Sequence, residues 1–403
     1  MSYVVAFNRD RDFYQLPLAL HERGMLDKLV TDYYRPDAAW VSKLPPFSRL
    51  AHRHVPGLPA GKVISRWRDV AWQMLAQKLG VSLYKMSRDV AADLSLTALR
   101  TAARSGADLF LYSEYAMEAF QRPEARAMRK GLFFFHPHTR LIREILSQDF
   151  AAHPECAWSM AHDFDMAQPA VQLDRLDQEW SLADFIACAS GFTKRSLTAS
   201  GCPAEKVTVT PYGIDVARVP FAPDARNGNG LCRFLFVGQG VQRKGLHHLL
   251  KAWRKLRLPQ AELTVVAAFI DPGIAALAGE GVRILSRQSR ADLWRLYNES
   301  HVFVMPSLVE GFGLVYLEAL AAGCYAVGTD NTGLPDLAAS PAEAMSVPPA
   351  DVDSLAAALE AVYGRQRRGE LDHRAIRDFA ARRGWGGFRQ AVADLAATNG
   401  AKR

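Results

Sequence analysis

The chain has 403 residues, of which 49% are hydrophobic and 23% are charged, a balance typical of globular proteins and unlike that of disordered or fibrous chains. This length favours two domains, because a single hydrophobic core stops growing at about 250–300 residues. The formal charge of +7 favours acidic partners. Because no arginine-rich helix, zinc finger or aromatic-basic motif accompanies this charge, we expect no nucleic-acid partner.

The N-terminus lacks the basic start and long apolar core of a secretory signal, so we expect a cytoplasmic protein. The apolar stretches, such as residues 132–135 and 302–305, are much shorter than the roughly 20 residues of a membrane-spanning helix. The five cysteines form no Cys-x-x-Cys pair, which favours reduced, structural thiols. The stretch from Lys43 to Arg68 is basic and has no acidic residue. It is either a solvated loop or a patch that meets phosphate or lipid headgroups, and in the second case it could dock on an anionic membrane from the cytoplasmic side.

Short apolar runs alternate with longer amphipathic segments, which is the pattern of a parallel sheet covered by helices on both faces. In the first half we expect strands at residues 3–7, 28–31, 108–112, 132–135, 185–188 and 207–210, with helices that include 16–23 and 193–199. A second series of strands is expected at residues 233–238, 263–267, 282–285, 302–305 and 325–328. Turn-forming residues between the two series predict a linker over residues 216–231. We therefore predict an α/β fold with domains at residues 1–215 and 232–383.

The strongest chemical signal follows the expected strand at residues 302–305. Glu310, Gly311, Phe312, Gly313 and Leu314 lead into a helix that contains Glu318. The glycines permit close backbone approach, and the free amides at the start of the helix attract an anion such as a diphosphate. Glu310 and Glu318 can face one crevice, where carboxylates would accept hydrogen bonds from sugar hydroxyls.

A second glycine loop follows the expected strand at residues 233–238. It begins at Gly238 and carries Arg243 and Lys244 just before a helix. Cations at the start of a helix oppose its dipole, so a bound anion explains this pair better than two solvated side chains do. The guanidinium and the ammonium can reach a diphosphate as a bidentate fork and a point charge.

Polar residues also follow two strands of the first half, at the edge where parallel sheets bind ligands. His136 is expected to donate to a sugar hydroxyl or to stabilise the reacting centre, the alternative being that it only satisfies a backbone carbonyl. Residues expected on the acceptor side, although no glycine-rich loop is present there, are Asn8, Arg9, Asp12 and His138.

Several catalytic motifs are missing from the sequence. There is no Gly-x-Gly-x-x-Gly motif after the first strand, no Walker loop, no His-Glu-x-x-His site and no Gly-x-Ser-x-Gly elbow, which argues against oxidoreductases, nucleotide hydrolases and esterases. Asp163 and Asp165 have the spacing of a metal-binding pair, but we interpret them as a surface or acceptor-side feature. We expect neither a cofactor nor a metal, with cations and helix amides in the place of a divalent ion.

The segment from Glu310 to Glu318 resembles the Glu-x7-Glu motif of glycosyltransferase family 4. The loop with Lys244 is similar to the Val-Gly-Arg-Leu and Lys-Gly loop of that family, with Gln239 in place of arginine and Arg243 as a replacement for the lost charge. Tyr212 stands where the family usually has asparagine. The resemblance covers roughly residues 179–347.

This resemblance implies the GT-B fold, in which two Rossmann-like domains face a central cleft and a C-terminal helix at about residues 384–403 packs back on the first domain. It implies a retaining, metal-independent transfer of a hexose from a UDP- or GDP-linked sugar to a glycan or lipid-linked acceptor, in surface polysaccharide or glycolipid biosynthesis. His136 and Glu310 would then be catalytic. The donor would be held by Gly238, Arg243, Lys244, Gly311, Phe312, Gly313, Leu314 and Glu318.

Two other functions fit the same fold. A sugar-nucleotide epimerase would bind the donor and need no acceptor. A non-catalytic binding protein is suggested by Gln239 and Tyr212 at family positions, whereas Glu310, Glu318 and Lys244 argue against it.

Overall fold

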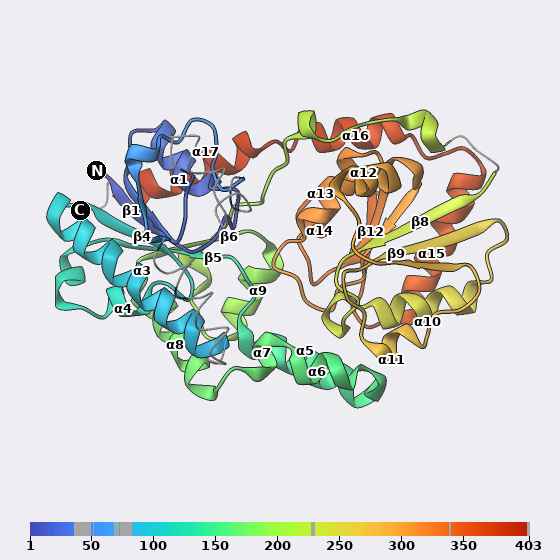
Figure 1. The fold of residues 1–403 in the computed structure, drawn as a ribbon, viewed down its shortest axis with the longest axis horizontal. Helices are drawn as coiled ribbons and strands as arrows, with labels where there is room; N and C mark the ends of the chain where they lie inside the picture. The colour runs from blue at the N-terminus through green and yellow to red at the C-terminus, as the bar shows by residue number, and fades with distance from the viewer. Residues whose placement is uncertain are drawn as a thin grey trace.

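The computed structural model describes residues 1–35, 50, 52–67, 72, 83–226, 230–337 and 340–400. Within these residues the chain forms two parallel β-sheets, each packed between helices, and the two resulting domains lie side by side (Figure 1). The α/β fold with two Rossmann-like domains is therefore confirmed.

The sheet of the first domain has seven described strands, all paired in parallel. In spatial order they are β3 (Val63–Ser65), β2 (Leu26–Thr31), β1 (Tyr3–Ala6), β4 (Asp108–Tyr112), β5 (Lys130–Phe134), β6 (Phe185–Cys188) and β7 (Val207–Val209). All residues of β1, β4 and β6 are buried, which explains their nearly continuous apolar sequences.

The sheet of the second domain has six described strands, also parallel. Their order is β10 (Val282–Leu285), β9 (Ala261–Val266), β8 (Cys232–Val237), β11 (Val302–Val304), β12 (Tyr325–Thr329) and β13 (Ala344–Val347). The carboxyl ends of parallel strands share one edge of the sheet, so the loops that follow β8 and β11 are neighbours.

Helices connect the strands of both sheets. In the first domain they are α1 (Gln15–Glu22), α3 (Leu83–Ser105), α4 (Met117–Phe120), α5 (Thr139–Ala152), α6 (Ala157–His162), α7 (Phe164–Ala167), α8 (Ala170–Leu182) and α9 (Gly191–Ala199). In the second domain they are α10 (Leu246–Leu256), α11 (Pro272–Ala275), α12 (Arg290–Glu299), α13 (Leu314–Ala321), α14 (Leu334–Leu337), α15 (Val352–Arg367) and α16 (His373–Ala381).

The expected strands agree with the structure within about two residues, and those at 108–112, 185–188 and 282–285 agree at both ends. Two strands, β3 and β13, are missing from the sequence prediction. Both lie at the outer edge of a sheet and are only partly buried. Such edge strands lack the long apolar runs that mark the central strands.

The last helix, α17 (Trp385–Gly400), returns to the first domain and lies against α1 (Figure 1). The Tyr3 hydroxyl donates to the Ala396 carbonyl at 3.0 Å. The chain thus passes between the domains twice, and the two passages touch where the Ile214 amide donates to the Arg383 carbonyl at 3.0 Å. A Cβ on Gly213 would lie 2.5 Å from the backbone of Gly384, so this crossing requires a glycine.

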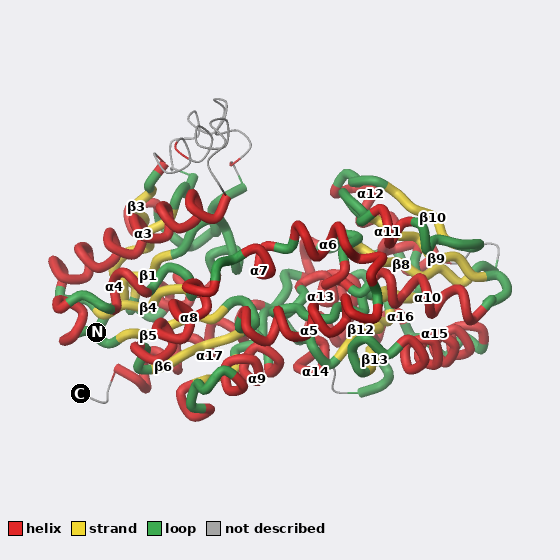
Figure 2. The backbone as a smooth tube through the Cα atoms, turned by 90° about the horizontal axis from the view of Figure 1, so that it is seen from below, coloured by secondary structure: helices red, strands yellow, loops and turns green. Residues whose placement is uncertain are grey.

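Helices α5 to α7 extend from the first domain beneath the second (Figures 1 and 2). Side chains of α5 and α9, including Ile142, Leu146 and Phe192, form an apolar cluster with Leu308 and Val309 of the second domain. The domains are therefore in contact at this side as well as at the two chain crossings.

The basic stretch from Lys43 to Arg68 is only partly described, since Lys43, Arg49 and Arg68 lie outside the described residues. Arg53 pairs with Asp32 at 2.7 Å and Arg66 with Asp93 at 2.7 Å, while Lys62 donates to the Leu26 carbonyl at 3.0 Å. These three cations thus already have partners within the protein. In the described part of the chain, no helix combines the length and the apolar character needed to cross a membrane.

Candidate active site

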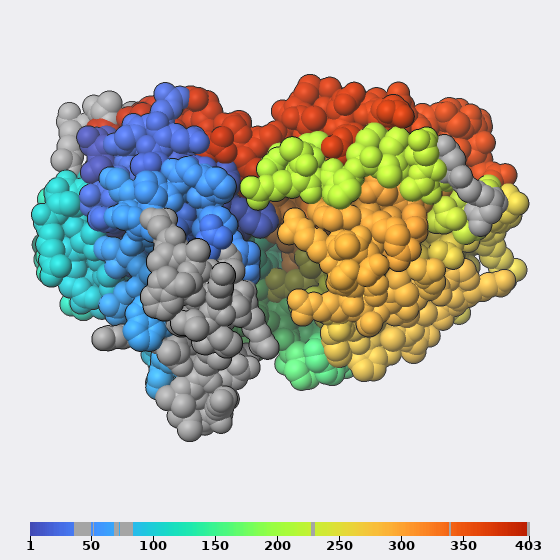
Figure 3. Space-filling view, turned by 45° about the horizontal axis from the view of Figure 1, so that its top comes forward, coloured from blue at the N-terminus to red at the C-terminus, as the bar shows by residue number. Residues whose placement is uncertain are grey.

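The candidate site lies where the carboxyl ends of the two sheets face each other. The loops after β8 and β11 reach it from the second domain, and the loop after β5 reaches it from the first. A hollow separates the two domains on the face shown in Figure 3. This is the edge at which open parallel sheets bind ligands.

The two loops of the second domain are locked together. Gly245 has a φ of 68°, and a Cβ there would overlap the carbonyl oxygen of Pro306. The Leu308 amide donates to the Arg243 carbonyl at 2.9 Å. This close packing places Arg243 and Lys244 beside the loop that carries Glu310.

Lys244 and Glu310 form an ion pair between these loops. About a fifth of each side chain is exposed. Burial disfavours the ionised carboxyl, but the adjacent Lys244 ammonium lowers the pKa of Glu310 below its ordinary value. Glu310 is therefore an ionised hydrogen-bond acceptor at neutral pH.

Arg243 bridges the two domains. Its Nε lies 2.8 Å from Asp163 Oδ2, its Nη2 lies 2.7 Å from Asp163 Oδ1 and 2.8 Å from Asp165 Oδ2, and its Nη1 lies 3.3 Å from His136 Nε2. Burial opposes the charge of Arg243, but Asp163 and Asp165 raise its pKa, so it stays charged.

Asp163 and Asp165 are expected from the sequence to be a surface or an acceptor-side feature, and the structure contradicts the first of these interpretations. Their side chains are only 12% and 5% exposed, because each pairs with Arg243 of the other domain. Asp163 also caps α7, accepting from the amides of Asp165 and Met166. The spacing of the two aspartates therefore lets both carboxylates hold the Arg243 guanidinium.

His136 is the most exposed member of this group, with 32% of its side chain exposed. Its Nδ1 lies 3.1 Å from the Pro137 carbonyl oxygen, and its Nε2 faces Arg243 and lies 3.9 Å from Asp165 Oδ2. One ring nitrogen thus contacts a backbone carbonyl, which was the alternative interpretation of this residue, while the other points to the charged cluster.

The start of α13 faces the same region. Gly313, with a φ of 88°, is the N-cap of α13, so the first amides of the helix receive no hydrogen bond from a cap side chain. A Cβ on Gly311 would lie 2.7 Å from the Phe135 carbonyl oxygen, which shows how tightly this loop meets the first domain. Phe312 is buried against Tyr212, so its side chain packs the domain boundary and only its backbone remains for a ligand.

Two other residues assigned to the donor have different surroundings. Gly238 ends β8 with room for a Cβ at ordinary contact distance, 3.5 Å from Phe236. Glu318 lies in α13, where burial raises its pKa and Arg290 partly opposes that rise. The charged group that acts on Glu318 is thus Arg290 of α12, whereas Lys244 acts on Glu310.

Two of the residues expected on the acceptor side have fully buried side chains. Asp12 is fully buried and accepts from the Leu16 amide at 2.8 Å and the Tyr112 hydroxyl at 2.7 Å. His138 is also fully buried and caps α5, with Nε2 3.1 Å from Asp177. Both side chains hold the first domain together.

The other two lie near the carboxyl end of β1. Asn8 is nearly buried and accepts from the Tyr115 hydroxyl at 2.8 Å. Arg9 is exposed, with a φ of 64° and an amide that donates to Asp32 at 2.8 Å. In place of the missing glycine-rich loop, three non-glycine residues adopt positive φ in this segment: Arg9, Phe13 and Tyr14. Such backbone strain is concentrated at functional sites.

Sequence reasoning missed two charged residues beside this loop. Arg11 stacks 3.8 Å from the ring centre of Phe135 and donates to the Tyr115 hydroxyl at 3.0 Å. Glu114 follows β4 with a φ of 75°, and burial raises its pKa while Arg11 and His136 oppose the rise. The one feature of the sequence that could have indicated these two residues is that each follows a central strand.

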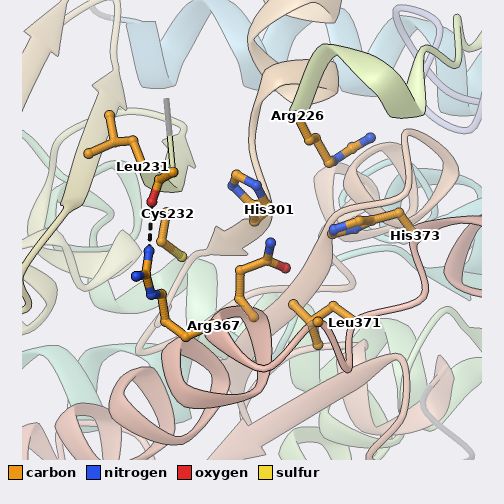
Figure 4. A pocket seen from close by; sticks show the side chains of 10 residues that line it. Arg226, Leu231, Cys232, His301, Arg367, Leu371 and His373 are labelled. Atoms are coloured by element: carbon orange, nitrogen blue, oxygen red, sulfur yellow. Dashed lines mark hydrogen bonds between the residues drawn. The ribbon is translucent and has the colours of Figure 1, made fainter. Parts of the chain in front are cut away.

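A separate cavity of about 390 Å³ opens in the second domain, at the opposite end of its sheet. His301 and Cys232 lie at the amino ends of β11 and β8, Arg367 lies beside Cys232, and His373 lines the opposite part of the cavity (Figure 4). Because the cavity is at the amino ends of the strands, it is not part of the candidate site.

Comparisons with known proteins match part of this chain to glycosyltransferases. Residues 228–379 match the family model described as "Glycosyl transferases group 1". The chain is 30% identical over 200 residues to glycogen synthase of Mycobacterium tuberculosis (strain CDC 1551 / Oshkosh), covering 48% of each protein. It is 27% identical over 194 residues to the amylovoran biosynthesis glycosyltransferase AmsK of Erwinia amylovora, covering 44% of this chain and 46% of AmsK. The matches thus span about half the length of these curated relatives.

Solved structures match over the whole chain. Sucrose-phosphate synthase of Thermosynechococcus elongatus aligns over 100% of both chains, with a TM-score of 0.67 and 18% identity. Anabaena HepE, solved in complex with UDP, aligns over 99% of this chain and 100% of its own, with a TM-score of 0.63 and 16% identity. The fold is therefore that of the GT-B glycosyltransferases, as the sequence predicts.

Proposed function

We propose that this protein is a retaining, metal-independent glycosyltransferase of family 4 type. It would move a hexose from a UDP- or GDP-linked sugar to a glycan or lipid-linked acceptor, in surface polysaccharide or glycolipid biosynthesis. The observation that carries the proposal is the cluster of Arg243, Lys244 and Glu310 beside the start of α13, opposite His136. Supporting this, HepE was solved with UDP, and AmsK is named for the biosynthesis of a polysaccharide.

The departing nucleotide diphosphate would be stabilised by two cations and the first amides of α13. Preorganised donors of this kind stabilise developing negative charge most strongly in a site from which water is excluded. Asp163 and Asp165 occupy Nε and Nη2 of Arg243 and leave Nη1 directed to His136. The two carboxylates would thus orient the guanidinium toward the cleft.

Glu310 and His136 would act on the sugar. Ionised Glu310 can accept hydrogen bonds from sugar hydroxyls once the donor diphosphate draws Lys244 away from it. His136 would approach the sugar from the first domain and donate to a hydroxyl group. Resemblance to family 4 implies that the acceptor attacks the face from which the diphosphate leaves, through a short-lived oxocarbenium-like species.

The experiment begins with the full chain, without added metal, and a panel of UDP-, GDP-, ADP- and dTDP-sugars. We expect one nucleotide to raise the melting temperature and to be released as its diphosphate when an acceptor is present. Lys244→Ala should lower kcat by about 100- to 1,000-fold, as does the loss of one transition-state donor. Lys255→Ala is the matched control, because Lys255 lies on α10 and pairs with Asp353.

Three outcomes would contradict the proposal. No shift with any nucleotide sugar would favour the non-catalytic alternative. Conversion of the donor sugar without an acceptor would favour the epimerase. Equal activity of Lys244→Ala and Lys255→Ala would remove Lys244 from the reaction.

We further propose that the protein works in the cytoplasm and docks on the anionic inner face of the membrane through the basic stretch at residues 43–68. A lipid-linked acceptor would be reached from that surface. Binding to vesicles that contain anionic lipid should weaken as salt is raised. Absence of binding to such vesicles at low salt would exclude this docking.

A further inference from the structure

Four potential metal ligands meet where α5 contacts the second domain. Asp149 lies in the last turn of α5 and His153 caps that helix, while His247 and His248 lie in the first turn of α10. One ligand atom from each residue lies within 4.8 Å of the ligand atoms of the other three. Figures 1 and 2 show α5 and α6 running beneath the second domain near α10.

The four side chains already form a compact group. Asp149 Oδ2 lies 3.0 Å from His247 Nε2, and Asp149 Oδ1 lies 2.6 Å from His248 Nε2. The ring centres of His247 and His248 are 3.9 Å apart, and His153 lies 4.8 Å from His248. Nitrogen and oxygen ligands lie about 2.0–2.2 Å from Zn²⁺, so four ligand atoms that now lie within 4.8 Å of one another need only small shifts to reach a single ion.

The charges and hydrogen bonds of the group leave a place for a cation. Asp149 is buried, and its ion-pair partners among the described residues are the two histidines, while its Oδ2 also accepts from Gln242 Nε2 at 2.8 Å. The Nδ1 atoms of His247 and His248 are buried without a hydrogen-bond partner. Lys251 contacts Nδ1 of His153 at 2.6 Å, which leaves the second nitrogen of that ring.

We propose that Asp149, His153, His247 and His248 bind a divalent transition-metal ion that joins the two domains. Three imidazoles and one carboxylate form a ligand set that suits Zn²⁺. His247 follows Lys244 by three positions, so the ion would hold the start of α10 and, through it, the loop with Arg243 and Lys244. This site is distinct from the reacting groups, and its test does not depend on the proposed reaction.

The test uses the full chain after treatment with EDTA and removal of the chelator. Titration with Zn²⁺ in a calorimeter should show one ion per chain with sub-micromolar affinity, and the ion should raise the melting temperature. His153→Ala and His248→Ala should each weaken binding by more than about tenfold, since even residues that only support metal ligands have effects of that size. His162→Ala is the control, because His162 is exposed and stacks on Trp158 outside the group.

Anomalous scattering at the zinc edge from crystals of the unaltered chain gives a second measurement, which needs no variant. A peak among the four side chains would support the site. No stoichiometric binding by the unaltered chain, an anomalous peak elsewhere, or unchanged affinity in both variants would overturn the proposal and leave the group as a hydrogen-bonded contact between domains.

Discussion

Gly245→Ala tests whether the packing of Gly245 on Pro306 organises the candidate site. A non-glycine residue at a φ of 68° costs about 1–2 kcal/mol in the left-handed region. The new Cβ would also overlap the Pro306 carbonyl oxygen, and overpacking of a well-packed site typically costs about 1–3 kcal/mol. The free energy of unfolding should therefore fall by about 2–5 kcal/mol in total.

The same change should damage activity beyond its effect on stability. Relief of the clash moves the loop with Arg243 and Lys244 away from the loop with Glu310, and a misplacement of 1 Å can cost about 100-fold in rate. Urea unfolding would measure the stability, and release of nucleotide diphosphate well below the unfolding midpoint would measure the rate.

Gly369→Ala is the matched control for Gly245→Ala. Gly369 also has a positive φ, 70°, and nothing lies within 4 Å of the position that a Cβ would take there. The free energy of unfolding of this variant should fall only by the cost of the left-handed conformation, about 1–2 kcal/mol. Its activity should be unchanged. If both variants lost equal stability and equal activity, the packing of Gly245 on Pro306 would not organise the site.

Three further predictions concern single side chains. Asp163→Asn should release part of the clamp on Arg243 and lower kcat by up to about 100-fold with little change in the melting temperature; full activity would contradict the clamp. Tyr212→Asn should lower the free energy of unfolding by about 2–4 kcal/mol, because Tyr212 packs on Phe312, Trp385 and Phe388; an unchanged urea midpoint would contradict this. Burial raises the pKa of Asp12 from 3.8 to about 6, so the folded state binds the proton more tightly and stability falls as pH rises through that interval; Asp12→Asn should flatten this slope in urea titrations.

The central strands could be predicted because burial on both faces gives them unbroken apolar sequences. The loops with Arg243 and Glu310 could also be predicted, since each combines glycine with charge directly after such a strand. The edge strands β3 and β13 could not, because their half-buried residues are too mixed to stand out.

Contacts between segments far apart in the chain could not be predicted from the sequence. The partners of Arg243 lie about 80 positions earlier in the chain, and nothing local distinguishes Asp163 and Asp165 from a surface pair. His136 and His138 follow the same strand, two positions apart. His138 is buried because it caps the first turn of α5, whereas His136 lies before the helix and stays partly exposed at the cleft.

The loop before α13 is both the expected donor site and a contact between the two domains. Gly311 is expected at the donor, yet a Cβ there would meet the Phe135 carbonyl oxygen of the first domain, and its own carbonyl accepts from Ser190 at 2.5 Å. The loop that would hold the sugar is thus also a contact between domains. Glu310 and His136 are adjacent to the two sides of this contact, so their relative position depends on it. Gly238 has no such backbone neighbour: a Cβ there would meet the Phe236 ring and the Met305 sulfur at ordinary contact distance, so packing does not require this glycine.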